Sequence, residues 1–267
     1  MTAAQGRKSI FITGAGSGIG RATAILFARR GWFVGLYDVS ARGLEETQGL
    51  MPPGSWISGV FDVRDRAGWS DAVCQFGDAT GGRMNVLFNN AGVGRHGWFE
   101  QVSQDDSDWI VDVNLKGVIN GVYAALPLLE ATPGARIVNT ASTAGVVGSP
   151  QLAVYSATKF AVRGLSEALD VEFSSKGIAV SCLTPWFVET PILDMAVREG
   201  ANEVMREKLK GMEVYPVEMA AEKAWDAAHG DEVVVPVGKR AAQARFMARF
   251  FPNGLRKQLK KTLPVRE

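Results

Sequence analysis

The sequence predicts a single α/β domain built on a doubly wound parallel sheet of about seven strands, with helices on both faces. Short apolar runs alternate with longer helical patterns along the chain, which is typical of strand–helix–strand units. A glycine-rich loop directly follows the first apolar run, as in sheets that bind ligands at their strand ends. The chain has 267 residues, 46% of them hydrophobic, which suits one large domain with a buried core.

The apolar runs are short and rich in Val, Ile, Leu and Phe, as expected of strands covered on both faces. Strands are expected near Ser9–Thr13, Trp32–Tyr37, Ser55–Phe61, Met84–Phe88, Arg136–Thr140, Ile178–Leu183 and Glu232–Val235. The clearest helices are expected at Ile19–Arg30, Arg66–Ala79, Gln104–Glu130 and Val154–Lys176. Residues 1–238 are thus expected to form one domain, in which a helical insertion at about 191–211 is expected as a lid.

Composition narrows the classes of function. Lys and Arg total 29 against 28 Asp and Glu, so a net charge of +1 gives no general attraction to nucleic acid. Cys74 and Cys182 lie far apart without metal-ligand neighbours, which indicates two small core residues and neither a disulfide framework nor a metal site. We find no signal peptide and no apolar stretch long enough to span a membrane. The expected location is the cytoplasm.

The glycine-rich loop, Thr13–Gly20, stands where the first strand passes into the first helix. Glycine permits positive φ and close backbone approach, so loop N–H groups and the helix N-terminus can bind a pyrophosphate. The second strand ends at Asp38, where a carboxylate accepts hydrogen bonds from ribose hydroxyls and repels a 2′-phosphate. The expected cofactor is therefore NAD. The loop residues expected to bind it are Gly14, Ser17, Gly18, Ile19 and Gly20.

Tyr155 and Lys159 are four residues apart in a helical pattern, so both side chains project from one face. A neighbouring ammonium stabilises a phenolate and lowers the pKa of the tyrosine toward working pH. Ser142 follows the predicted strand Arg136–Thr140 at the carboxyl edge, where open α/β sheets bind ligands. Its hydroxyl can donate a hydrogen bond to a developing alkoxide.

With Asn114 and the segment Asn89–Gly92 added, these features resemble a classical short-chain dehydrogenase/reductase over most of the chain. The resemblance implies that Tyr155 is the general acid/base and that Ser142 polarises the carbonyl. It also implies that Lys159 binds the nicotinamide ribose and lowers the pKa of the tyrosine. Asn114 is implied to hold a water molecule in a proton relay behind the lysine.

The same resemblance implies a Rossmann-like fold, further cofactor contacts and an oligomer. Asp62 and Val63 are expected beside the adenine and Asn90 at the ribose, with Val188 and Thr190 near the carboxamide. A homodimer or homotetramer is expected, with the helices predicted at 104–130 and 154–176 at the interfaces. The remaining cofactor residues implied are Ala91, Gly92 and Pro185.

The substrate side departs from the family pattern, because Pro185 is followed by Trp186 and Phe187 where members commonly carry glycine. Trp186 is expected either as an aromatic wall of the substrate site or as an outward plug against the 191–211 insertion. Val93 and His96 follow the fourth strand and are candidate substrate contacts, although a single loop histidine is more often solvated.

These residues predict an NAD-dependent oxidoreductase that interconverts a secondary alcohol and a ketone in a fairly apolar site. One alternative is a catalytically idle NAD sensor, which would need the loop and Asp38 but not the intact Ser142, Tyr155 and Lys159. Another is a reductase of acyl thioesters. The resemblance associates that activity with NADPH, and this chain lacks a basic residue at Ala15 or Val39.

The segment 239–267 carries nine Lys/Arg and one acid, whereas residues 1–238 have a net charge of −7. Helical spacing predicts a helix over Lys239–Phe251, ended by Pro252–Gly254. Three uses fit this basic amphipathic extension: packing on the acidic body or a neighbouring subunit, roofing the substrate site, or lying on an anionic membrane. Packing is the expected use. The predicted apolar arc consists of Ala242, Phe246, Met247, Phe250 and Phe251.

Overall fold

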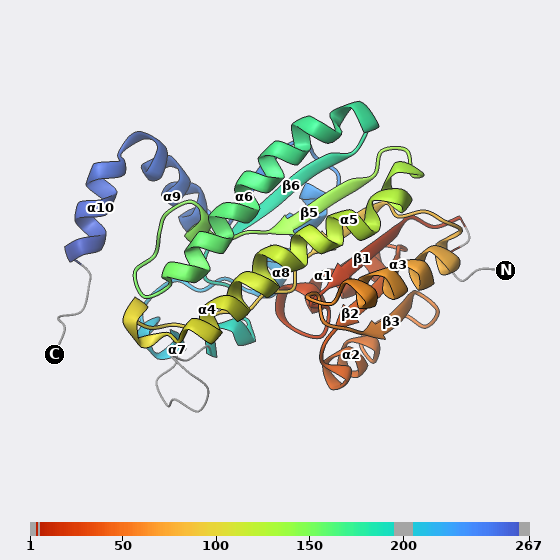
Figure 1. The fold of residues 1–267 in the computed structure, drawn as a ribbon, viewed down its shortest axis with the longest axis horizontal. Coiled ribbons are helices and arrows are strands. Elements are labelled where there is room, and N and C mark those ends of the chain that lie inside the picture. The colour runs from red at the N-terminus through yellow and green to blue at the C-terminus, as the bar shows by residue number, and fades with distance from the viewer. Residues whose placement is uncertain (1–3, 5, 195–204, 262–267) are drawn as a thin grey trace.

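The computed structural model describes residue 4, residues 6–194 and residues 205–261. Over this part of the chain, seven parallel strands form one sheet in the order β3-β2-β1-β4-β5-β6-β7 (Figure 1). The predicted fold class and all seven predicted strands are confirmed, each strand within two residues of its expected ends. The strands are β1 (Ser9–Thr13), β2 (Phe33–Asp38), β3 (Trp56–Val60), β4 (Val86–Asn89), β5 (Arg136–Thr140), β6 (Ala179–Pro185) and β7 (Val234–Val237).

Each face of the sheet has its own apolar core, because alternate residues of a strand point to opposite faces. On β1, Ile10 and Ile12 belong to one core, whereas Phe11 belongs to the other and stacks on Tyr37 with ring centroids 4.1 Å apart. Two helices cover the first face and three cover the second (Figure 1). These are α1 (Gly18–Arg29) and α8 (Val217–Ala227), then α3 (Arg66–Thr80), α5 (Gly117–Glu130) and α6 (Ala153–Phe173).

Two helices of the body were not singled out from the sequence. The short helix α2 (Ala41–Gln48) begins after Ser40, whose hydroxyl accepts a hydrogen bond from the Gly43 N–H at 3.0 Å. The helix α8 buries four alanines and packs the partly buried Val217 and Trp225 against the same core. A side-chain cap fixes the start of α2, whereas α8 has no such cap and is held by packing against α1.

The helix expected at Gln104–Glu130 is not regular along its length. Helix α4 (Gln104–Val111) and α5 are joined by a π-helical turn over Asp112–Lys116, which contains Asn114. Such turns re-aim side chains and are frequent at functional sites. The expectation for the cysteines was half wrong: Cys182 is buried, but Cys74 is exposed on α3.

The insertion expected at 191–211 is described only at its ends. It begins with a 3₁₀ turn over Pro191–Asp194 and continues with the short helix α7 (Met205–Lys208), and residues 195–204 lie outside the described residues. The Arg206 guanidinium forms ion pairs with Glu189 and, at 2.6 Å, with Asp194. These contacts fasten both described ends of the insertion to each other.

The C-terminal extension forms two helices, α9 (Lys239–Phe250) and α10 (Pro252–Lys261). The first helix ends before Pro252 as predicted, and Pro252–Gly254 forms the first turn of the second helix, since proline suits a first helical position. Helix α9 packs on the body through the buried Ala241 and the pairs of Arg240 with Glu213 and Arg245 with Glu232, and this rotation leaves the phenylalanines of the predicted arc exposed. Arg245 sets this rotation by donating to the Val234 carbonyl at 2.7 Å. Packing of the arc on a neighbouring subunit stays a prediction.

Candidate active site

A cavity of about 700 Å³ lies along the carboxyl ends of the central strands. The crevice arises there because the chain leaves β1 for β2 on one side and returns to β4 on the other. Among the residues expected at the site, only Gly20, His96 and Asn114 do not line it. The sequence-predicted residues on its wall are Gly14, Ser17, Gly18, Ile19, Asp38, Asp62, Val63, Asn90, Ala91, Gly92, Val93, Ser142, Tyr155, Lys159, Pro185, Trp186, Phe187, Val188 and Thr190.

The glycine loop fits closely against the end of β4. Gly14 has φ 67°, and a Cβ there would lie 2.9 Å from the Ala91 Cα and the Asn90 amide nitrogen. A Cβ on Gly20 would overlap the Gly14 carbonyl oxygen, so Gly20 packs α1 under the loop instead of lining the cavity. The hydroxyl of Ser17 lines the cavity and does not cap α1. A backbone cradle at a helix N-terminus therefore faces the cavity, as a pyrophosphate requires.

Asp38 is fixed at the end of β2 by two backbone donors. Its Oδ2 accepts from the Gly16 N–H and its Oδ1 from the Ser40 N–H, both at 2.9 Å. A Cβ on Gly16 would lie 3.0 Å from this carboxyl group, so glycine is needed for the close approach. The carboxylate lines the cavity beside Val39, in agreement with its expected position at the adenosine ribose.

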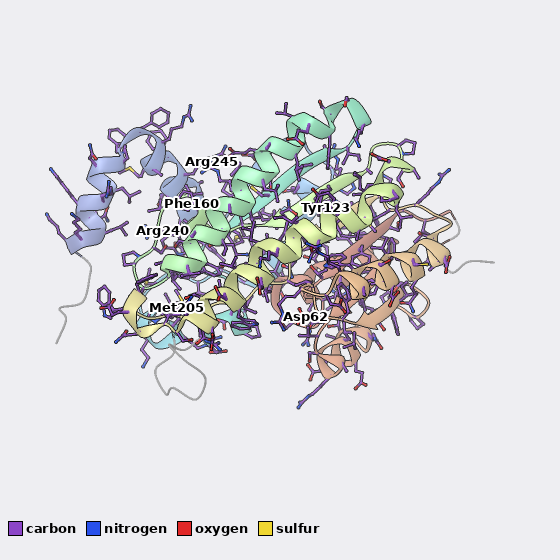
Figure 2. All side chains as sticks on the ribbon, viewed as in Figure 1. Asp62, Tyr123, Phe160, Met205, Arg240 and Arg245 are labelled. Atoms are coloured by element: carbon purple, nitrogen blue, oxygen red, sulfur yellow. The ribbon has the colours of Figure 1, made fainter. Side chains whose placement is uncertain are left out.

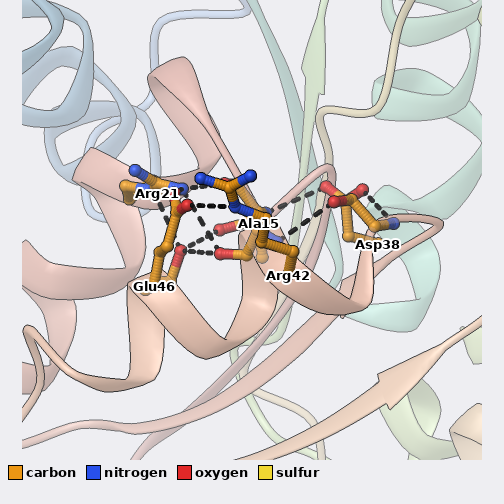
Figure 3. Close-up of polar contacts among 9 residues, drawn as sticks. Ala15, Arg21, Asp38, Arg42 and Glu46 are labelled. Carbon is orange, nitrogen blue, oxygen red and sulfur yellow. Dashed lines mark hydrogen bonds and ion pairs between the residues drawn. The ribbon is translucent and has the colours of Figure 1, made fainter.

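A second polar cluster backs this loop, and its residues were not singled out in the sequence (Figure 3). The Arg21 guanidinium donates to the Gly16 carbonyl and, at 2.8 Å, to Glu46. Glu46 also accepts from Arg42 at 3.0 Å, and hydrogen bonds from Arg21 and then Arg42 hold the pKa of Glu46 below its usual range. The loop and α2 are therefore joined by charge-assisted bonds.

On the cavity wall after β3, Asp62 forms an ion pair with Arg64 at 2.6 Å, and this hydrogen bond lowers the pKa of the Asp62 carboxyl. Deeper in the cavity, Asn90 is held from both sides. Its amide donates to the Thr13 carbonyl at 3.1 Å, and its oxygen accepts from the Thr140 hydroxyl at 3.2 Å. These two side chains are thus oriented before any ligand binds.

Ser142 and Tyr155 meet on the opposite wall. Ser142 follows β5 and caps a 3₁₀ turn over Thr143–Gly145, where its hydroxyl accepts a hydrogen bond from the Ala144 N–H at 3.1 Å. Burial raises the pKa of Tyr155 to about 12, and the nearby Ser142 hydroxyl lowers it in part. Burial therefore makes the phenol a weaker acid than a free tyrosine.

Lys159 lies one helical turn from Tyr155 and is buried. Its Nζ lies 5.5 Å from the centre of the Tyr155 ring and donates to the Thr140 carbonyl at 2.7 Å. Burial lowers the pKa of Lys159 to about 8. A buried ammonium that uses one donor on the backbone keeps others for a bound group.

Asn114 is fully buried behind this wall. Its side chain bonds both backbone groups of Val93, accepting from the N–H at 2.8 Å and donating to the carbonyl at 2.9 Å. A Cβ on Gly92 would lie 3.3 Å from the Asn114 Oδ1 and 3.5 Å from the Lys159 Nζ. Asn114 thus positions the strand end beside the lysine and does not reach the cavity itself.

The remaining end of the cavity is apolar. Trp186 and Phe187 line it with an edge-to-face contact at 5.1 Å, and the Trp186 indole N–H donates to the Glu213 carbonyl at 3.1 Å. Trp186 thus combines the two expected orientations: it is a cavity wall, and it is tied to the segment after the insertion. Sequence reasoning missed the residues that complete this wall, since they are distant in sequence and carry no motif. They include Arg95, Trp109, Leu152, Ile192, Leu193 and Met205.

His96 is buried outside the residues that line the cavity, so it is neither solvated nor a wall of the site. No group of His, Cys, Asp or Glu among the described residues could hold a metal ion. A search of the described helices found none long and apolar enough to cross a membrane.

Comparison with known proteins adds three findings. Residues 8–201 match the family model described as short chain dehydrogenase. The chain is 36% identical to the 3-oxoacyl-[acyl-carrier-protein] reductase of Thermotoga maritima (70% of this chain, 76% of the relative) and 34% identical to the cyclohexanol dehydrogenase of an Acinetobacter strain (70% and 75%). A short-chain dehydrogenase/reductase from Burkholderia phymatum, crystallised with NAD, superposes with a TM-score of 0.81 at 29% identity and covers 98% of each chain.

Proposed function

Because this chain belongs to the short-chain dehydrogenase family, we propose that it is an NAD-dependent oxidoreductase that interconverts a secondary alcohol and a ketone. The observation that carries the proposal is one wall of the cavity, which Ser142, Tyr155 and the buried Lys159 line together, with the Lys159 Nζ 5.5 Å from the centre of the Tyr155 ring. A secondary-alcohol dehydrogenase among the relatives supports the reaction class. A cytoplasmic site of action fits the two unpaired cysteines.

The cofactor end of the cavity fits NAD. The cradle around Gly14 and the N-terminus of α1 suit the pyrophosphate, and the Asp38 carboxylate suits the adenosine ribose hydroxyls. A 2′-phosphate would meet that carboxylate as a like charge. When bound, NAD accepts the hydride that leaves the alcohol carbon.

Ser142, Tyr155 and Lys159 are proposed to carry out the remaining steps. The Ser142 hydroxyl holds the substrate oxygen, and the Tyr155 phenolate takes the proton of the alcohol hydroxyl. Lys159 binds the nicotinamide ribose, and its ammonium favours the phenolate, which opposes the rise in the pKa of Tyr155 caused by burial. In the reverse direction, Tyr155 returns the proton to the ketone oxygen. Asn114 is proposed to serve the proton relay behind Lys159.

The substrate is proposed to be largely apolar. Trp186 and Phe187 form one side of its site, and Val93 lies on the opposite strand end. A buried apolar cluster of Leu152, Leu193, Met205 and Leu209 packs against Tyr155 and Phe187, which places the described ends of the insertion over this region. The insertion is proposed as its lid.

The test is a panel of secondary alcohols with the purified protein and NAD at alkaline pH, followed by the absorbance of the reduced cofactor. We expect turnover with bulky apolar alcohols. Consumption of reduced cofactor only with 3-oxoacyl thioesters would instead establish the acyl-thioester reductase, an activity found among the relatives. Tight NAD binding without turnover of any panel member would establish the idle sensor.

A homodimer or homotetramer is proposed through α5 and α6. Tyr123 on α5 and Phe160 and Val171 on α6 are exposed apolar side chains on these two helices (Figure 2). Isologous pairing of such faces is the usual route to twofold assemblies. Light scattering of the wild-type protein and of the Tyr123→Glu variant tests this interface. The variant should have the smaller assembly mass.

A further inference from the structure

Helices α9 and α10 together form a feature that the proposed activity does not use, here called the C-terminal arm (residues 239–261). Helix α9 packs on β7, whereas α10 contacts α9 and buries none of its own residues (Figure 1). The base of the arm is fixed to the body. The Arg240 N–H donates to the Tyr215 hydroxyl at 3.3 Å, and its guanidinium pairs with Glu213 at 3.2 Å.

Three phenylalanines of the arm form a cluster in solvent. Phe246, Phe250 and Phe251 are 55%, 59% and 53% exposed. The ring of Phe246 lies 4.9 Å from that of Phe250 and 6.1 Å from that of Phe251. Single exposed apolar residues are common on soluble proteins, but a contiguous aromatic patch indicates an interaction site.

The arm is also strongly basic, with eight Lys/Arg and no acid over residues 239–261. Two of these bases are neutralised by the body, in the pairs of Arg240 with Glu213 and of Arg245 with Glu232. The other six form no ion pair with a described residue, and five of them lie beyond the first turn of α9. They are Lys239, Arg249, Arg256, Lys257, Lys260 and Lys261.

We propose that the C-terminal arm is a peripheral membrane-binding surface that takes the headgroups of anionic lipids. Aromatic rings placed among unpaired cations match the boundary between headgroups and acyl chains, where rings bury their apolar faces and bases meet lipid phosphates. Pairing of two arms about a twofold axis would instead bring two sets of unpaired cations together, which is electrostatically unfavourable.

The experiment is co-sedimentation of the full-length protein with vesicles of phosphatidylcholine containing about 30% phosphatidylglycerol, and with vesicles of phosphatidylcholine alone. We expect binding to the anionic vesicles at about 50 mM salt and at least about tenfold weaker partition at about 500 mM, because salt screens these charges. Absence of binding at low salt, or equal binding to the neutral vesicles, would overturn the proposal.

Two variants separate the contribution of the phenylalanine cluster from that of the basic residues. The triple variant Phe246→Ser/Phe250→Ser/Phe251→Ser and the charge variant Lys257→Glu/Lys260→Glu should each weaken partition into anionic vesicles by at least about tenfold. The matched controls Leu50→Ser, equally exposed at 55% on the far side of the fold, and Arg66→Glu/Arg83→Glu should bind as the wild type does.

Circular dichroism and NAD binding check that each variant is folded, so a loss of partition reports on the arm. Partition unchanged in the triple phenylalanine variant would overturn the proposal, since the aromatic cluster would then have no part in binding. A change of oligomer size in the arm variants without lipid, together with no vesicle binding by the wild type, would assign the arm to a second copy of the chain or another acidic protein surface.

Discussion

The two ends of the cavity are built differently. At the nucleotide end, Asp38, Asn90 and Arg21 are each held by two or more hydrogen bonds, mostly to backbone groups. At the substrate end, Trp186 has one hydrogen bond, and the surrounding Phe187 and Leu152 contribute apolar surface. Directional bonds fix one defined ligand, whereas apolar surface selects by size and shape. From this difference we expect strict selection of the cofactor and selection of the substrate by its volume.

The largest effect should come from Tyr155→Phe, at the boundary between the two ends. The ring still packs, but the proton carrier is gone, so kcat should fall by about 10²–10⁴-fold while NAD affinity stays within a few fold. Steady-state kinetics and fluorescence titration of NAD measure the two quantities. Tyr123→Phe, on an exposed face, is the matched control. Near-normal turnover by Tyr155→Phe would remove the proposed role of Tyr155.

A smaller effect is expected at the nucleotide end from Asp38→Ala. Removal of the carboxylate removes its repulsion of a 2′-phosphate, so the NAD/NADP ratio of kcat/KM should fall by about 10- to 100-fold. Asp62→Ala is the control, because Asp62 also lines the cavity and its expected place beside the adenine is shared by both cofactors. An unchanged ratio in Asp38→Ala would place the source of selectivity elsewhere in the loop.

Lys159 offers a test through pH. Its folded-state pKa of about 8 lies below the ordinary value of 10.5, so between these values the unfolded chain binds more protons and stability rises with pH. The stability of the Lys159→Met variant should lack this rise with pH. The variant's unfolding free energy relative to wild type should therefore fall by about 2 kcal/mol from pH 8 to pH 10.

Urea unfolding of the cofactor-free protein at several pH values measures the difference for Lys159→Met. The interval ends at pH 10 because the raised pKa of Tyr155 acts in the opposite direction above it. Lys176→Met, which removes an exposed partner of Glu130, should show no such trend. If the difference in unfolding free energy between Lys159→Met and wild type did not change with pH, the buried lysine would keep its ordinary pKa.

The smallest effect should come from Trp186→Ala at the substrate end. Loss of the indole enlarges the apolar site, so the ratio of kcat/KM for bulky over small alcohols should rise about tenfold or less, with NAD affinity unchanged. Trp56→Ala, a half-buried tryptophan outside the cavity, controls for lost packing. A lower melting temperature with an unchanged substrate profile would show that Trp186 acts as a plug and not as a selective wall.

The sequence alone predicted the strands, the glycine loop and the catalytic wall, because each depends on local pattern. A short apolar run in the sequence indicates a strand that is buried on both faces. The positions of Asp38 and Ser142 follow from the rule that strand ends of a parallel sheet share one edge, and Tyr155 was predicted from its helical spacing to Lys159 and from the family resemblance. These residues therefore meet in the cavity as expected.

Tertiary structure decided the features that depend on contacts between residues far apart in the sequence. The rotation of α9, which exposes Phe246 and its neighbours, depends on a bond from Arg245 to β7. The burial of His96 and the apolar cluster around Leu193 and Met205 depend on segments far apart in sequence. Periodicity states which residues of a helix share a face, but only packing against neighbours decides which face is buried.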